Sequence, residues 1–266
     1  MKRKKKQQSF YIFGKNPVAE YLSRKPEQVL RVLISDSLPQ GESSPLMELA
    51  KKERIPVSKI SKKNFSRYVG DVSHQGVIAL VKTFPYLALE DFLEILEEKK
   101  GTQPLVLILD HIQDPHNFGA IVRTAVAAGI DGIIIPKDNQ APVNGTVFKT
   151  SAGTILSIPI VRVANISHAI GKLRKKDFWV ASFDTPEDED TKPYTLYWNS
   201  HLVESPMVFV FGSEGKGVSE RVKKESDFIF SIPMDNGVES LNVSVSVAVA
   251  LYEWKRQKVM GYDKKS

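Results

Sequence analysis

Cysteine is absent from this chain of 266 residues, and histidine occurs only five times. Without cysteine the protein has no disulfide, no thiolate metal ligand and no cysteine nucleophile. No two histidines stand in an H-x-x-x-H or H-E-x-x-H pattern, so we predict no metal site.

Long hydrophobic runs are also missing. No stretch approaches the ~18 apolar residues of a membrane span. Met1–Gln8 is basic and no apolar segment follows it, so this segment does not match a secretory signal. We therefore expect a cytoplasmic protein without membrane association.

The chain does contain enough apolar material for a folded core. Hydrophobic residues make up 42% of it, including 13 Phe, 8 Tyr and 3 Trp, which excludes a wholly disordered chain. The length is ordinary for two domains.

Positive charge is concentrated in the first third of the chain. The formal net charge is +6, from 37 Lys and Arg against 31 Asp and Glu. Residues 1–83 carry 17 basic and 7 acidic side chains, whereas residues 101–266 carry 18 and 19. A basic module joined to a near-neutral one indicates nucleic-acid binding, because each Lys or Arg contact with phosphate releases counterions. A basic face that only aids solubility is the alternative.

The first part of the chain is predicted to be a basic tail, residues 1–9, followed by a small α/β domain, residues 10–83. Residues 10–22 indicate a strand, a turn and a helix, with Asn16 as N-cap and Pro17 at the first helical position. Further strands are predicted at residues 29–34, 55–58 and 76–82, and a helix at residues 45–53. The acidic, helical segment 84–100 is predicted to be a linker.

The second part, residues 101–266, alternates strand and helix signals, which is typical of an open parallel sheet. Strands are predicted at residues 105–109, 133–136, 157–163, 178–183, 207–211 and 227–233. Helices are predicted at residues 120–128, ended by Gly129, and at residues 168–176. Residues 241–251 alternate with strand period, although the residues that follow favour a long helix.

Three polar loops follow predicted strands, where parallel α/β sheets bind ligands. The first loop, residues 110–117, opens the helix that contains Arg123, and Asn117 is a candidate cap for that helix. A turn, a cap and a surface arginine are the structural alternative. His111 and His116 are expected to be turn residues.

The second loop is glycine-rich and spans residues 211–219. Glycines let backbone N–H groups approach a ligand closely. The loop is not a Walker A loop, because Lys216 is followed by Gly217 and not by Ser or Thr. Its glycine spacing does not match the G-x-G-x-x-G dinucleotide fingerprint either. A simple glycine turn explains this loop equally well when it is taken alone.

The third loop spans residues 231–243. A strand ends at Pro233, a polar loop follows, and either Ser240 or Asn242 is placed to cap the next helix. A loop with a helix cap is again the structural alternative.

Together and in this order, the three loops resemble motifs 1, 2 and 3 of the SpoU (TrmH) family of RNA ribose 2′-O-methyltransferases. The resemblance covers residues 105–258. The first ~80 residues resemble the substrate-binding domain of that family through Gly14–Val18 and His74–Val77. The pattern is most similar to the branch that methylates a guanosine of bacterial 23S rRNA.

The resemblance implies an α/β fold whose C-terminal parallel sheet carries a trefoil knot, the SPOUT methyltransferase fold, with a small L30e-like domain before it. In that fold the third loop leads into a helix, so we predict a helix at residues 241–251. The implied cofactor is S-adenosylmethionine. The residues implied to contact it are Phe211, Gly212, Gly217, Ile232, Met234 and Leu241. The residues implied to be catalytic are Asn117, Arg123, Glu214, Ser240 and Asn242.

Arg123 matches the catalytic arginine of the family. Since a guanidinium is normally always charged, two roles stay open for it. It acts beside the target phosphate either as a base or as an electrostatic anchor for the developing alkoxide. Asn117 is expected to orient Arg123 or the ribose, and Glu214 and Asn242 are expected to position loops or the substrate nucleotide.

The resemblance also implies partners. RNA, and 23S rRNA in particular, is the expected substrate, and a homodimer is the expected assembly. Two alternatives stay open, namely the same chemistry on tRNA or another rRNA nucleotide, and a non-catalytic RNA-binding ribosome-assembly factor. The second alternative predicts the loss of Asn117, Arg123 or the motif 2 glycines, and all of them are present.

Overall fold

The computed structural model describes residues 9–99, 101–184, 195–196 and 203–263. The chain divides into two compact units, each with a sheet of its own. The first unit contains the residues up to Pro85 together with Pro142–Leu156, and the second contains Tyr86–Ala141 and the residues from Ser157 onward.

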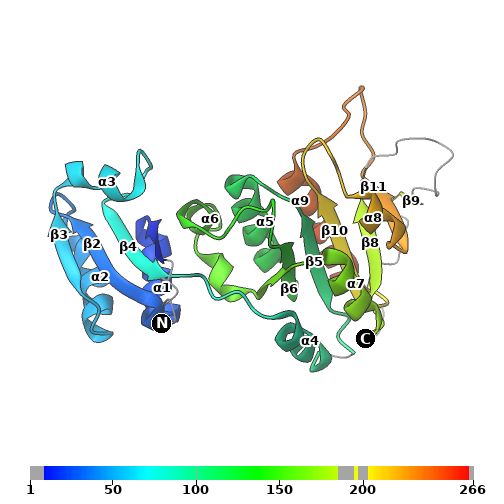
Figure 1. The fold of residues 1–266 in the computed structure, drawn as a ribbon, viewed down its shortest axis with the longest axis horizontal. Coiled ribbons are helices and arrows are strands. Elements are labelled where there is room, and N and C mark those ends of the chain that lie inside the picture. Colours follow the sequence, from blue (N-terminus) through cyan, green and yellow to red (C-terminus); the bar gives the residue numbers. More distant parts are fainter. Residues whose placement is uncertain (1–8, 100, 185–194, 197–202, 264–266) are drawn as a thin grey trace, which may run out of the picture. The chain divides into compact units, whose positions relative to one another are not determined.

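The first unit is built on a four-stranded sheet of order β1-β4-β2-β3 (Figure 1). Its helices and strands are β1 (Ser9–Phe13), α1 (Lys15–Arg24), β2 (Val29–Ser35), α2 (Gln40–Lys52), β3 (Val57–Ile60), α3 (Ser66–Val69), β4 (Val77–Lys82) and α6 (Gly145–Thr150). Strand β4 pairs antiparallel with β1 and β2, and β2 pairs parallel with β3. The small α/β domain and its strands at residues 29–34 and 76–82 are thus confirmed.

Two helix starts in this unit differ from prediction. Helix α1 begins directly after Gly14, which has a φ of 99° and occupies the N-cap position, so the prediction that Asn16 caps it is wrong. Helix α2 begins five residues before Pro45, which lies inside the helix. Ser43 and Leu46 on either side of this proline are buried, so packing carries the helix through the proline.

The two sequence segments that carry the family resemblance in this unit lie together. The backbone N–H of Gly14 donates to the Val77 carbonyl at 3.0 Å, and the backbone N–H of Lys15 donates to Oε1 of Gln75 at 3.0 Å. These bonds join the start of α1 to the turn before β4.

His74, which precedes this turn, is held by an aromatic ring. Its imidazole stacks on Phe65 with ring centroids 4.4 Å apart, and its Nδ1 accepts the backbone N–H of Gly76 at 3.0 Å. Burial, and after it the positive charge of Lys62, lowers the pKa of His74. The neutral imidazole is therefore the form that this turn favours.

The second unit is built on a seven-stranded sheet of order β7-β6-β5-β10-β8-β11-β9, in which every pair of neighbours is parallel (Figure 1). Its helices and strands are α4 (Leu89–Glu97), β5 (Leu105–Asp110), α5 (Pro115–Ala128), β6 (Gly132–Pro136), β7 (Ile160–Val163), α7 (Ile166–Arg174), β8 (Trp179–Phe183), β9 (Thr195–Leu196), β10 (Met207–Gly212), α8 (Glu220–Lys224), β11 (Phe228–Ser231) and α9 (Val243–Asp263). The predicted parallel α/β sheet is confirmed.

The central strands of this sheet are buried on both faces, as their unbroken apolar sequences predict. One face packs with α4, α7 and α8 in a single hydrophobic cluster that includes Phe92, Leu173 and Val222. Helix α9 contacts β10 and packs against α5, and its buried Val247, Leu251 and Trp254 lie outside that cluster. These two helices therefore cover the other face.

Helix α5 begins earlier than predicted. Asp114 is its N-cap and accepts the backbone N–H of His116 at 2.9 Å, and Pro115 occupies the first helical position. The prediction that Asn117 caps this helix is wrong, and its amide is left available for other contacts. Gly129, with a φ of 80°, ends the helix as predicted.

The predicted helix after the third loop is confirmed as α9. Oδ1 of Asn242 accepts the backbone N–H of Ser244 at 2.9 Å, so Asn242 caps this helix. Val243, Val247 and Ala250 are buried at helical spacing, which overrides the strand-like alternation of the sequence. The trefoil knot stays a prediction. Among the described residues, no helix has the length and apolar character needed to span a bilayer.

Candidate active site

The three predicted loops meet at the carboxyl edge of the parallel sheet. They follow β5, β10 and β11, and β5 and β10 are neighbours at the centre of the sheet. The chain runs from β5 outward to β6 and β7 and then returns to the other side of β5, so the β5–β10 boundary is a topological switch point. Open α/β sheets bind their ligands at such a point.

Three polar side chains from the three loops form one hydrogen-bonded cluster. Asn117 Nδ2 donates to Glu214 Oε1 at 2.7 Å. Asn242 Nδ2 donates both to Asn117 Oδ1 and to Glu214 Oε1, each at 3.0 Å. A single carboxylate oxygen thus fixes two amides that lie 97 and 28 residues from it in the chain.

A cavity of about 320 Å3 lies between the loops after β8, β10 and β11. All six residues implied to contact the cofactor line it, and so do Glu214 and Ser240. The other lining residues include Phe183 and Asp184 at the end of β8 and Glu239 in the third loop. The walls combine apolar side chains with exposed backbone and a few carboxylates.

Glycine is required at two points of this wall. A Cβ atom on Gly212 would lie 1.8 Å from the carbonyl oxygen of Gly217. A Cβ atom on Gly217, where φ is 62°, would lie 2.7 Å from Oδ1 of Asp184. The loop after β10 therefore folds back directly onto the end of its own strand, where no side chain fits.

A second cavity, of about 740 Å3, adjoins the first. Both cavities are lined by Ser213, Glu214, Lys216, Gly217 and Val243. The second cavity takes much of the rest of its lining from the first loop. Its remaining residues are Asp110, His111, Ile112, Gln113, Asp114, Asn117, Asn139, Val218, Ser219 and Glu220.

His111 adopts an unusual backbone conformation at the rim of the second cavity. Its φ is 67°, which a residue with a side chain seldom adopts. The imidazole Nδ1 lies 2.5 Å from Oδ1 of the buried Asp110. His111 lies in a bend of the loop, in line with the prediction of a turn residue, and it also lines a cavity. The same prediction for His116 is wrong, because His116 lies in the first turn of α5.

Arg123 makes none of the hydrogen bonds of the polar cluster. It is an exposed residue of α5 and lines neither of the two cavities. Four of the five residues implied to be catalytic thus lie at the cluster or on a cavity wall, and the arginine does not.

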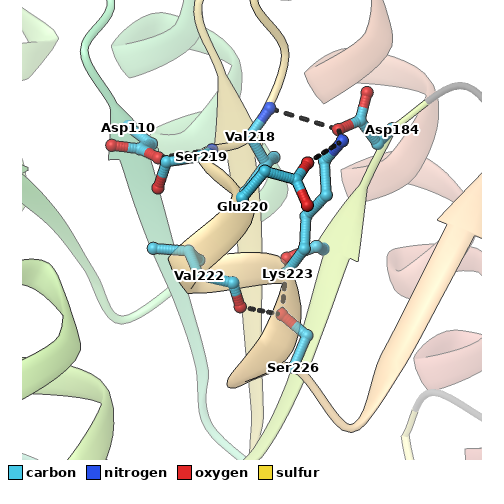
Figure 2. A network of polar contacts seen from close by, with 9 residues as sticks. Asp110, Asp184, Val218, Ser219, Glu220, Val222, Lys223 and Ser226 are labelled. Atoms are coloured by element: carbon cyan, nitrogen blue, oxygen red, sulfur yellow. Dashed lines mark hydrogen bonds and ion pairs between the residues drawn. The ribbon is translucent and has the colours of Figure 1, made fainter.

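Sequence reasoning missed two charged residues beside the cavities. Asp184 directly follows β8, and Lys223 on α8 is buried against it (Figure 2). The position of Asp184 at the carboxyl end of a parallel strand was a usable signal. Lys223 stands in a charged helical stretch that predicts a solvated surface, so the sequence carried no signal for it.

Comparison with known proteins agrees with this geometry. Residues 104–252 match the SpoU rRNA methylase family, and residues 11–87 match the RNA 2′-O ribose methyltransferase substrate-binding domain. The chain therefore belongs to the SpoU family, and it is an S-adenosylmethionine-dependent RNA methyltransferase.

Two curated relatives match over nearly the whole chain. The YacO protein of Bacillus subtilis, named for the TrmH family of tRNA/rRNA methyltransferases, is 36% identical over 95% of this chain and 97% of its own. The 23S rRNA (guanosine-2′-O-)-methyltransferase RlmB of Pseudomonas putida is 34% identical over 93% of this chain and 96% of its own.

Two solved structures share the fold. The SpoU methyltransferase AviRb of Streptomyces viridochromogenes, in complex with AdoMet, has a TM-score of 0.76 at 21% identity and covers 95% of this chain and 91% of its own. An AdoMet-bound rRNA methyltransferase of Sinorhizobium meliloti has a TM-score of 0.74 at 24% identity, with 93% and 87% covered.

Proposed function

We propose that the protein methylates the ribose 2′-hydroxyl of a guanosine in 23S rRNA. The observation that carries the proposal is the Asn117–Glu214–Asn242 cluster, which lies where two cavities adjoin. The guanosine target is supported by the relative from Pseudomonas putida, whose name states that reaction.

The first cavity fits S-adenosylmethionine. Its volume of about 320 Å3 falls in the range of small-molecule sites. Ile232, Met234 and Leu241 offer apolar cover for an adenine, and three glycines of the same lining, Gly212, Gly215 and Gly217, place no side chain over their peptide groups. When bound, the cofactor supplies a methyl group on a positively charged sulfur.

The second cavity is the proposed place of the target nucleoside. Glu214 lines both cavities and Asn117 lines the second, so the cluster is placed to hold the ribose against the methyl donor. The 2′-oxygen would receive the methyl group that the bound cofactor supplies, and the hydroxyl would lose its proton. Alignment of the hydroxyl and removal of its proton are what the protein must add.

Glu214 is the proposed acceptor of that proton. It is the carboxylate shared by the two cavities, and one of its oxygens already holds both amides. Glu214→Gln keeps a carbonyl oxygen for these amides and removes the base. We expect kcat to fall by about 10²-fold or more, with cofactor affinity unchanged within a factor of about three. Unchanged kcat would reject this role.

Arg123 is the proposed electrostatic anchor for the target phosphate or the developing alkoxide. It is exposed, and a guanidinium in contact with water keeps its charge, which disfavours a role as base. Lys substitution keeps the charge and loses the planar fork. Near-normal turnover of Arg123→Lys would exclude a specific guanidinium role.

We propose a homodimer whose site combines Arg123 of one protomer with the cluster of the other. Arg123 is exposed and lines neither cavity of its own chain, which supports a shared site. Apolar side chains exposed at and around α9 support a protein interface there; they are Leu241, Val245, Tyr252, Val259 and Met260.

A mixing experiment tests the shared site. Arg123→Ala and Asn242→Ala are each expected to be inactive as homodimers. After unfolding and refolding together in equal amounts, half of the dimers combine one chain of each kind, and one of their two sites is intact. About a quarter of wild-type activity is then expected. No activity in the mixture would place both residues of a site in one protomer, and a monomer mass by light scattering would refute the dimer.

We propose that RNA binding belongs to the first unit, predicted as residues 10–83, and catalysis to the second unit, predicted as residues 101–266, with the basic tail 1–9 before them and the acidic segment 84–100, which contributes α4 to the second unit, between them. The excess positive charge of residues 1–83 and the family match at residues 11–87 support this division. We also propose a cytoplasmic location, where ribosomal RNA is modified. Removal of residues 1–83 is expected to weaken RNA binding and to reduce its salt dependence, and unchanged RNA affinity would reject the assignment.

The direct test of the function is transfer of labelled methyl groups from S-adenosylmethionine to unmodified 23S rRNA and, in parallel, to tRNA transcripts. Label at one guanosine ribose of 23S rRNA is the expected result. Label in tRNA alone would keep the chemistry and overturn the substrate. Cofactor binding without label in either RNA would favour the assembly-factor alternative.

A further inference from the structure

Two aspartates flank the end of the central strand β10. Gly212, its last residue, pairs in register with Asp110 on β5, and Phe211 pairs with Phe183 on β8. Asp184, one residue beyond Phe183, therefore lies level with Gly212 on the opposite side. Both carboxylates stand beside the point where the glycine-rich loop leaves the sheet.

The loop returns over Gly212 and is held by both aspartates. The backbone N–H of Val218 donates to Asp184 Oδ2 at 3.3 Å, and the next N–H, that of Ser219, donates to Asp110 Oδ2 at 3.0 Å (Figure 2). Consecutive peptide groups are thus tied to the two strands that flank β10. The close approach of Gly217 to Gly212 shows how little room this arrangement leaves for displacement.

Lys223 completes the arrangement from below the loop. Its Nζ lies 2.8 Å from Asp184 Oδ2 and 3.1 Å from Glu220 Oε1, and the lysine is only 8% exposed. Burial alone disfavours the ammonium form, but the hydrogen bonds that Lys223 donates to Asp184 and Glu220 outweigh it and raise the pKa of Lys223 above its usual range. The lysine is therefore a fixed positive charge.

The end of α8 is fixed to β8 as well. Ser226 Oγ donates to the Val222 carbonyl at 2.9 Å and lies 2.6 Å from Oγ of the buried Ser182 on β8. Both ends of the segment that carries Lys223 are consequently tied to the sheet. We call Asp110, Asp184 and Lys223 the aspartate clamp.

We propose that Asp184 and Lys223 are positioning residues for methyl transfer, because the aspartate clamp sets the loop of residues 213–217 in its cofactor-binding shape. The proposal rests on the proposed function and names the residues that prepare its site. Asp184 lines the first cavity and Asp110 the second, so the clamped loop, with Glu214 on it, is the wall between them.

The energetics of the buried Asp184–Lys223 ion pair indicate that it positions the loop and does not mainly stabilise the fold. A buried lysine–carboxylate pair contributes little net stability compared with apolar residues of the same size, because both charges lose hydration. Removing one partner is costly, since the other charge is left buried without compensation. Loss of Lys223 would therefore drive Asp184 toward water, and Val218 and the loop would move with it.

The test compares Lys223→Met with Lys224→Met, because Lys224 is the exposed neighbour of Lys223 on the same short helix. The measurements are the cofactor dissociation constant by calorimetry, the KM values for cofactor and RNA, and kcat. Lys223→Met is expected to raise the cofactor Kd and KM by about tenfold or more, with the RNA KM within a factor of about three. Lys224→Met is expected to leave all of them within a factor of about two.

A smaller change guards against loss of folding. Lys223→Gln keeps one donor toward Asp184 and removes the charge, and a rise of about threefold in the cofactor Kd is expected. If Lys223→Met does not fold, Lys223→Gln decides the test. Unchanged cofactor Kd and KM in the folded variants, or an equal rise in the RNA KM, would overturn the proposal. Cofactor binding can be measured without any methyl transfer, so failure of the proposed function would be seen separately.

Discussion

Replacing Gly212 with alanine perturbs the most crowded point of the site. Gly212 is buried at the end of β10, and its backbone is in an ordinary extended conformation that alanine also adopts. The added methyl group would meet the Gly217 carbonyl oxygen at 1.8 Å, the Gly217 carbonyl carbon at 1.9 Å and the Val218 nitrogen at 2.2 Å. All three are backbone atoms, so no side-chain rotation can relieve the contact.

The cost follows from what must move. The Gly217–Val218 peptide has to retreat by roughly 1.2 Å to bring the shortest contact to 3.0 Å. That movement strains the bond from Gly217 N–H to the Ser213 carbonyl and the bond from Val218 N–H to Asp184. A neutral hydrogen bond contributes about 1 kcal/mol and one to a charged group about 1.5–3 kcal/mol, so we expect a loss on the order of 3 kcal/mol.

Tryptophan fluorescence in urea measures this loss selectively. Of the 3 tryptophans of the chain, the two that the structure describes, Trp179 and Trp254, belong to the second unit. The control is Gly171→Ala on α7, where a Cβ atom meets nothing within 4 Å. Since alanine suits a helix better than glycine, this control should gain about 0.5–1 kcal/mol.

Cofactor affinity is the second measure of the Gly212 variant. A displaced loop changes the shape of the first cavity, so the cofactor Kd of Gly212→Ala should rise by about tenfold or more. Gly171→Ala should leave it unchanged. If Gly212→Ala matched the wild type in both urea midpoint and cofactor Kd, the packing argument for the loop would be refuted.

Three further predictions concern other parts of the chain. Tyr21 is fully buried, and its hydroxyl has no hydrogen-bond partner among the described residues. Burial, and after it the charge of Glu27, raises the pKa of Tyr21 to about 12. Tyr21→Phe should therefore stabilise the first unit by up to about 1 kcal/mol, measured by hydrogen exchange of β1 and β4, and a loss of protection would contradict this. The lowered pKa of His74 means that protons bind preferentially to the unfolded chain. The contribution of His74 to stability is therefore present above the ordinary pKa of about 6.5 and is lost as the pH falls below it. Hydrogen exchange at Gly76 should show this pH dependence, His74→Phe should reduce it, and an identical profile in the variant would argue against the reasoning. Asn242→Ala removes both a helix cap and two hydrogen bonds of the polar cluster. It should lower the urea midpoint by an amount corresponding to about 1 kcal/mol and also reduce kcat. Ser244→Ala keeps the bond from the backbone N–H of residue 244 to the Asn242 side chain, so it should leave kcat unchanged.

Much of the active site could be predicted because its residues follow strands of one parallel sheet. Asn117, Glu214 and Asn242 lie up to 125 residues apart in the chain, yet each loop leaves the carboxyl edge of the same sheet. Apolar strand sequences and the polar residues of the loops can be recognised locally in the sequence. Because the strands are parallel, the loops that follow them lie at one edge of the sheet, and their side chains come close together. The residues implied to contact the cofactor line one cavity for the same reason.

Helix limits were predicted less well, because neighbouring residues compete for the same cap. Asp114 and Asn117 are both good N-cap residues, and the choice of Asp114 depends on Pro115 fitting the first helical position. This choice has a functional consequence. An Asn117 side chain that capped α5 would be bound to the backbone of its own helix and could not also bridge Glu214 and Asn242.

The aspartate clamp lay beyond the reach of the sequence for a different reason. Lys223 sits in the run Glu220–Glu225, whose charges are those of an exposed helix surface. Only the three-dimensional arrangement shows that Lys223 points inward to Asp184 while Lys224 remains exposed. A charged side chain is buried only where a partner of opposite charge compensates it. The partner of Lys223 is Asp184, which lies 39 residues away in the chain and follows another strand.

The proposed role of Arg123 also depends on a partner that is distant in sequence, in this case a second copy of the chain. Every other residue implied to act in the reaction lies at the cluster or on a cavity wall of a single chain, whereas Arg123 is exposed on α5. In the proposed mechanism, a second chain brings Arg123 to the reacting atoms. The mixing experiment with Arg123→Ala and Asn242→Ala therefore tests the mechanism and the dimer together, since only a shared site restores activity from two inactive variants.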